Sequence, residues 1–168
     1  MAKNTTFSPS YLRNFIFGVE DSLVSTVGLL SGIALTGISI KAILLTGTVL
    51  IFVEAFSMAA GSFLSEHSAE EYREQREMPL GISLASGSIM FFSYFLSGFI
   101  PLFPYIFFSI NTALWMSILL SLFVLFILGA AGAKISRTGL ARGGLRMAII
   151  GGIAIAIGVA VGKLVGRI

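Results

Sequence analysis

Three acidic residues, Glu20, Asp21 and Glu54, stand inside long apolar stretches of the sequence. An ionisable side chain within a membrane span costs roughly 2.5–3.5 kcal/mol on insertion scales, so it normally faces the interior of a helix bundle and marks an ion or proton pathway. The nearest basic residues, Arg13 and Arg146, lie close to the ends of their stretches, where long side chains reach the membrane surface. Carboxylates without an internal cation hold protons or attract a cation. The three acids therefore predict a cation site that exchanges with protons.

Small and oxygen-bearing residues follow two of these acids at helical spacing. Asp21 shares a helix face with Ser25, Gly28 and Gly32, and Glu54 shares one with Ser57, Met58 and Gly61. A carboxylate and a thioether one turn apart are an unusual pair in a membrane span. Oxygen together with sulfur suits a borderline transition metal such as Fe²⁺ better than Mg²⁺ or Ca²⁺, which prefer oxygen alone.

The composition indicates that helices in a membrane must position these side chains. The 168 residues are 56% hydrophobic and only 11% charged, and their mean hydropathy is +0.97. Soluble domains carry about 25% charged residues, so most soluble enzyme folds are excluded. The absence of cysteine excludes disulfides and thiolate chemistry. We expect neither a catalytic domain nor a nucleotide-binding loop, and therefore no enzyme activity.

Five apolar stretches predict an all-α membrane protein with five transmembrane helices, forming a single transmembrane domain over residues 1–168. Their approximate bounds are 14–38, 42–64, 80–100, 105–131 and 145–165. A cytoplasmic N-terminus and an external C-terminus would place eight of the 11 basic residues in the cytoplasm, in accordance with the positive-inside rule. Those eight are Lys3, Arg13, Arg73, Arg76, Lys134, Arg137, Arg142 and Arg146.

Residues 65–79 carry the remaining five acids and form either a short acidic cytoplasmic loop or an extension of the second helix. Cations approaching from the cytosol could be collected by its acids and its histidine, namely Glu66, His67, Glu70, Glu71, Glu74 and Glu77. The alternative is an ordinary solvated helix face held by salt bridges to neighbouring arginines.

Two motifs resemble those of the vacuolar iron transporter family. Residues 17–32, around Glu20 and Asp21, resemble the first-helix signature of that family, and residues 57–65 resemble its second-helix Ser-Met-x-x-Gly motif. Residues 145–162 are similar to its last helix. The resemblance covers most of the chain, but the segment at 65–79 is too short for the full cytoplasmic metal-binding domain of well-studied members. The sequence thus resembles a short member of the family.

The resemblance implies a homodimer that exports Fe²⁺, and also Mn²⁺, from the cytosol in exchange for protons. Asp21 and Met58 match family positions associated with the ion path. The chain departs from the family pattern at three positions. Ser22 replaces the glycine that usually follows the aspartate. Many members carry a second-helix acid at the position of Leu50, whereas the acid of this chain is Glu54, one turn closer to Met58. Ser62 replaces a glutamate that is frequent at its position.

We therefore expect Asp21, Glu54 and Met58 to bind the transported metal, with Glu20 and Asp21 coupling transport to protons. No permanently bound cofactor is expected. The expected partners are the metal ion, protons, the lipid bilayer and a second copy of the chain, without nucleic acid. The membrane would be the plasma membrane in a prokaryote and a vacuolar-type membrane in a eukaryote. The alternative is a non-transporting membrane scaffold or partner subunit whose intramembrane acids only hold helices together.

Overall fold

The computed structural model describes residues 9–166, which form helices joined by short connections and contain no strand. Five spans are long and apolar enough to cross a membrane: α1 (Pro9–Ala34), α2 (Ile40–Glu74), α3 (Gly81–Leu102) continued by the one-turn α4 (Pro104–Phe107), α5 (Ile110–Ile135) and α6 (Leu140–Val165). The expected all-α architecture with five membrane-spanning helices is confirmed. The chain is a multi-pass integral membrane protein.

Local sequence signals set the ends of α2. Ser39 precedes the helix in an extended conformation, and its Oγ accepts a hydrogen bond of 3.3 Å from the Ala42 backbone N–H, which caps the first turn. At the other end, Gln75 has a positive φ of 53° and its N–H bonds the Glu71 carbonyl. This left-handed residue stops the helix, so Glu77 lies beyond it.

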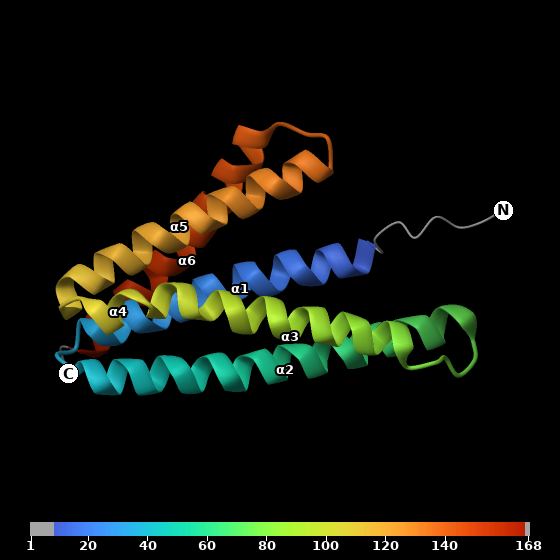
Figure 1. Ribbon diagram of the computed structural model, residues 1–168, viewed down its shortest axis with the longest axis horizontal. Coiled ribbons are helices and arrows are strands. Elements are labelled where there is room, and N and C mark those ends of the chain that lie inside the picture. The colour runs from blue at the N-terminus through green and yellow to red at the C-terminus, as the bar shows by residue number, and fades with distance from the viewer. Residues whose placement is uncertain (1–8, 167–168) are drawn as a thin grey trace.

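Helix α1 lies in the middle of the bundle and packs against α2, α3, α5 and α6. Helices α2 and α3 form one antiparallel pair beside it, and α5 and α6 form another (Figure 1). At the end where α1 begins, the α5–α6 pair leans away from the other three helices (Figure 1). The acids carried by α1 are therefore placed between two helix pairs that diverge toward this end.

Four glycines bring α1 and α6 into backbone contact. A Cβ built on Gly158 would lie 2.7 Å from the Gly28 carbonyl oxygen, and one built on Gly162 would overlap the backbone of Gly32. Small residues at a crossing let helices approach closely in lipid, where burial of apolar surface provides little drive for association. The glycines of α6 therefore hold it against α1 within one chain.

Two prolines shape the third span and shift the start of the fourth. Pro101 lies inside α3, and Pro104 opens the separate turn α4, so Tyr105 belongs to the third span. The fourth span begins at Ile110, whereas the sequence predicted a start near residue 105. Proline interrupts a helix because it lacks the backbone N–H donor. The Ser117 hydroxyl of α5 donates a 2.7 Å hydrogen bond to the Pro101 carbonyl and joins α5 to this bend.

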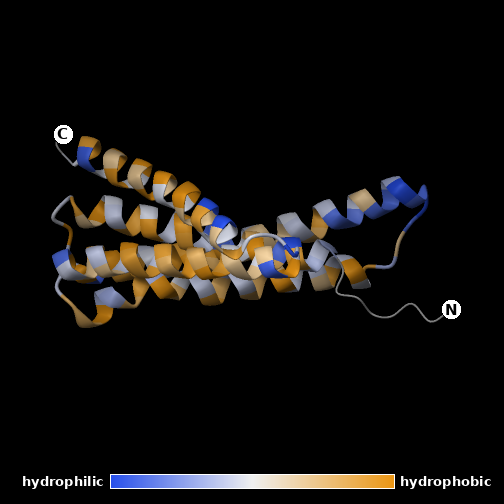
Figure 2. Cartoon of the chain, turned by 90° about the horizontal axis from the view of Figure 1, so that it is seen from above, coloured by the Kyte–Doolittle hydropathy of each residue, from blue (hydrophilic) through white to orange (hydrophobic). Residues whose placement is uncertain are grey.

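The last turns of α2 form a polar extension of the bundle. Figure 2 shows hydrophilic residues gathered at that end of α2, while the rest of the helices are mainly hydrophobic. The helix runs on to Glu74, so residues 65–74 are helical and carry four of the five acids of the polar segment.

Candidate functional site

Asp21 of α1, Glu54 of α2 and Tyr94 of α3 lie on the side of the bundle that these three helices form. Each carboxylate lies within electrostatic range of the other and of the Tyr94 hydroxyl. Each acid is partly buried, and Tyr94 is fully buried. We call Asp21, Glu54 and Tyr94 the carboxylate cluster. It draws one residue from each of three helices.

Tyr94 is held in place by two serines of α1. Its hydroxyl shares a 2.8 Å hydrogen bond with Ser25 Oγ, in which either oxygen can donate. Its carbonyl oxygen accepts a 2.6 Å hydrogen bond from Ser22 Oγ. Both serines follow Asp21 within about one turn of α1, so the same short stretch of this helix positions the carboxylate and the phenol.

A cavity of about 730 Å³ lies one helical turn from the carboxylate cluster. Its lining includes Phe17 of α1, Met58 of α2 and Met90 of α3, and each of these stands four residues from a member of the cluster. Residues four apart are neighbours on a helix surface. Arg13 and Ser65 also line the cavity, so it lies toward the end of the bundle where α1 begins and α2 ends. We call it the vestibule.

The sequence predicted Asp21, Glu54 and Met58 as one site; in the structure Asp21 and Glu54 lie within electrostatic range of each other, and Met58 stands one helical turn from Glu54. The structure also adds Tyr94 and Met90, which the sequence reasoning missed. Both lie on α3, which has no charged residue to attract attention. The available signal was a series of serines along α3, Ser83, Ser86, Ser93 and Ser97, all of them buried. Such a series marks a face directed toward other helices.

Glu20 faces a different part of the molecule. It lines a cavity of about 340 Å³ between α1, α5 and α6, together with Arg146, Ser136 and Thr138. Adjacent residues on a helix point about 100° apart, which directs Glu20 away from the vestibule although its charge still interacts with that of Asp21. Arg146, an exposed residue near the start of α6, therefore lies beside Glu20 at this cavity.

The acids of the polar segment are mostly engaged with other residues. Glu66 is only 16% exposed; its Oε2 accepts hydrogen bonds from Ser10 Oγ at 2.6 Å and from the Arg13 guanidinium at 3.1 Å. Glu70 accepts a 3.3 Å bond from Ser83 Oγ of α3. These contacts fasten the extension of α2 to α1 and α3.

The remaining members of the segment are partly buried or exposed. His67 lies 3.3 Å from Glu71, and Glu74 pairs with Arg73 at 3.6 Å. Glu77 follows the helix end and does not share its face, because the left-handed Gln75 turns the chain away. The segment therefore does not present one continuous row of free carboxylates.

Within residues 9–166, no three His, Asp or Glu side chains lie together in a way that could hold a metal ion. The carboxylate cluster offers two carboxylates and one phenol, with thioether sulfur nearby. A single copy therefore supplies only part of the oxygen ligands that a divalent cation takes.

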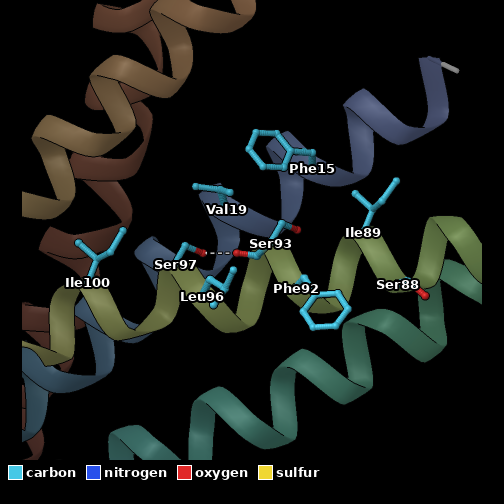
Figure 3. A pocket seen from close by; sticks show the side chains of 9 residues that line it. All are labelled: Phe15, Val19, Ser88, Ile89, Phe92, Ser93, Leu96, Ser97 and Ile100. Carbon is cyan, nitrogen blue, oxygen red and sulfur yellow. Dashed lines mark hydrogen bonds between the residues drawn. The ribbon is translucent and has the colours of Figure 1, made fainter. Parts of the chain in front are cut away.

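A second groove between α1 and α3 has a different chemistry. It has a volume of about 510 Å³ and is lined mainly by apolar side chains, including Phe15, Val19 and Phe92. Figure 3 shows these side chains around it, with Ser97 donating a hydrogen bond to Ser93 of the same helix. Among residues 9–166, none of the side chains that line this groove is titratable, so it is not proposed as a cation site.

Comparison with known proteins gives matches over most of the chain. The chain matches the family model of the VIT family over residues 12–79 and 75–163. Vacuolar iron transporter homolog 2 of Arabidopsis thaliana is 27% identical over 180 residues, which cover 98% of this chain and 91% of the relative. Vacuolar iron transporter homolog 4 of the same plant is 29% identical over 183 residues, covering 98% and 90%. Vacuolar iron transporter homolog 5 of Oryza sativa subsp. japonica is 27% identical over 170 residues, covering 92% and 79%.

Proposed function

The chain belongs to the VIT family, and we propose that it carries a divalent transition-metal cation, Fe²⁺ or Mn²⁺, out of the cytosol in exchange for protons. The proposal agrees with relatives named as iron transporter homologs. The transported ion is a substrate, and the account requires no resident cofactor. The membrane would be of vacuolar type in a eukaryotic cell and the plasma membrane in a prokaryotic cell.

The observation that carries the proposal is that Asp21 and Glu54, two acids inside membrane-spanning helices, lie within electrostatic range of each other. Two carboxylates from different helices share a site with a buried tyrosine and lie one turn below an open vestibule. Their mutual repulsion in a low-dielectric setting is relieved by a cation or by protons. The site can therefore hold either a metal ion or protons, as an exchanger requires.

Coupling follows from competition for the same oxygen atoms. A carboxylate must be deprotonated to bind a metal, so metal binding releases protons and acid weakens the binding. On the cytosolic side Asp21 and Glu54 would bind the cation, and on an acidic side protons would displace it. Glu20, which faces the separate cavity with Arg146, would carry protons beside this path.

The direction of transport rests on the charge distribution. Seven basic residues stand at the end of the bundle where α1 begins, and Lys41 and Lys163 stand at the opposite end. The seven are Arg13, Arg73, Arg76, Lys134, Arg137, Arg142 and Arg146. The positive-inside rule assigns the richer end to the cytoplasm. The vestibule would then admit cations from the cytosol, with the polar extension of α2 beside its mouth as a collecting surface.

A second copy of the chain would complete the site. Helix α2, which carries Glu54 and Met58, leaves most of its surface uncovered, and Phe56 next to them is 71% exposed. Ser57 and Gly61 are exposed where they line the vestibule. A homodimer joined along this side would cover the polar groups from lipid and bring a second pair of carboxylates to the ion.

Metal uptake into proteoliposomes with an acidic interior tests the proposal, because transport distinguishes it from a structural scaffold. The parent protein should accumulate Fe²⁺ only when the pH gradient is present. Asp21→Asn should abolish accumulation and metal binding, whereas Glu20→Gln, which alters the neighbouring residue, should keep metal binding and weaken the dependence of transport on pH. If Asp21→Asn accumulates Fe²⁺ as well as the parent does, the assignment of the ion path is wrong.

A further inference from the structure

Met90 is a buried residue of α3 that contributes to the vestibule. Its side chain is only 2% exposed, and it lines this cavity together with Met58 of α2. The sequence contains six methionines, and these two from different helices line one cavity beside a pair of carboxylates. Met90 stands four residues before Tyr94, as Met58 stands four residues after Glu54. The two thioethers therefore lie on the same side of the carboxylate cluster.

A glycine of α1 fixes the position of the Met90 sulfur. A Cβ added at Gly18 would lie 3.1 Å from Met90 Sδ and 3.2 Å from its carbonyl oxygen, and it would overlap Ser93 Oγ. Only glycine leaves room for α3 to bring the thioether against the α1 backbone. Gly18 stands three residues before Asp21, so the sulfur is held one helical turn from the first carboxylate.

The vestibule contains polar groups whose bonding is incomplete. Asn14 Nδ2 and Ser62 Oγ are buried, and neither has a hydrogen-bond partner among the described residues. Both residues line the cavity with the two methionines. Buried polar atoms are normally satisfied by a protein group, water or a ligand. A cation entering with some of its water would supply partners to both groups.

The donor set identifies the class of cation. Thioether sulfur is a soft and uncharged ligand, so it binds soft cations more strongly than hard ones. Carboxylates, in contrast, attract every divalent cation through their charge. Mg²⁺ and Ca²⁺ prefer oxygen ligands. We propose that Met90 supplies a second thioether beside Met58, which was already expected on the ion path, and that the two form a thioether station in the vestibule that favours soft and borderline divalent cations before they reach Asp21 and Glu54. The inference deepens the proposed function and rests on it.

Competition in proteoliposomes tests the role of Met90 in selectivity. Fe²⁺ uptake is measured at increasing concentrations of Cd²⁺, a soft competitor, or of Mn²⁺, a harder one. The proteins compared are the parent, Met90→Leu, Met58→Leu and the control Met116→Leu, which changes an exposed methionine of α5. Leucine conserves the volume of methionine. Both vestibule variants should weaken inhibition by Cd²⁺ several-fold without weakening inhibition by Mn²⁺, whereas Met116→Leu should alter neither.

If Cd²⁺ inhibits Fe²⁺ uptake equally in Met90→Leu and Met116→Leu, the proposed thioether station is wrong. A parent protein that moves no metal would instead refute the proposed function, so the two failures are distinguishable.

X-ray absorption of Cd²⁺ bound to the parent protein gives a second test that needs no variant. The chain has no cysteine, so any sulfur in the first coordination shell must come from methionine. The station predicts sulfur scattering in the parent protein. A first shell of oxygen and nitrogen alone would contradict it, and Met90 would then be a packing residue that fills the space beside Gly18.

Discussion

Replacement of Gly162 by alanine should loosen the contact between α6 and α1. The new Cβ would overlap three backbone atoms of Gly32, so neither helix can give way by moving a flexible side chain. Overpacking of this kind costs about 1–3 kcal/mol. For a chain of this size, each kcal/mol of lost stability lowers the melting temperature by about 2–4 °C. The melting temperature of Gly162→Ala should therefore fall by roughly 2–12 °C.

Gly152→Ala is the matched control, since it makes the same change on the same helix. Its Cβ would meet only Leu122 Cδ2 at 3.5 Å, an ordinary contact distance. The assay is thermal unfolding of the detergent-solubilised protein, followed by size-exclusion chromatography after heating. Gly162→Ala should melt well below the parent and Gly152→Ala at or above it. Equal melting temperatures for the two variants would refute the glycine-mediated crossing of α1 and α6.

Two further predictions concern the surroundings of the carboxylate cluster and the mouth of the vestibule. Tyr94→Phe removes the 2.8 Å bond to Ser25 and should lower the free energy of unfolding by about 0.5–1.5 kcal/mol, whereas Tyr72→Phe, at a side chain that is 81% exposed, should leave it unchanged. Arg13→Ala removes a cation from the vestibule lining and releases Glu66, so the KM for Fe²⁺ uptake should fall, and Glu66→Gln should raise it. Equal stability of the two tyrosine variants, or an unchanged KM in Arg13→Ala, would contradict these assignments.

The five spans were predictable because hydropathy over about 20 residues dominates the folding of a chain in lipid. The boundary near Tyr105 was missed because apolar residues continue without interruption past Pro101 and Pro104, and only the backbone shows where one span ends. Hydropathy alone does not distinguish a helix that bends from one that stops.

Asp21, Glu54 and Met58 of the candidate site could be predicted from the sequence, whereas Tyr94 and Met90 could not. Asp21 and Glu54 stood out because charge is costly in lipid, and in the structure they lie within electrostatic range of each other. Tyr94 and Met90 could not be assigned in the same way, since a tyrosine or a methionine in an apolar helix is most often packing material. Their role depends on which face of α3 meets α1, and that depends on Gly18 and on the serines that bond Tyr94.

The pairing of Asp21 and Glu54 as the metal site within the membrane is the central claim, and anomalous scattering from crystals soaked in Mn²⁺ or Fe²⁺ tests it most directly. The account predicts a metal peak between the two carboxylates, below the vestibule. A peak confined to the polar extension of α2, beside Glu71 and Glu74, would contradict it and would move cation binding to the surface of the protein.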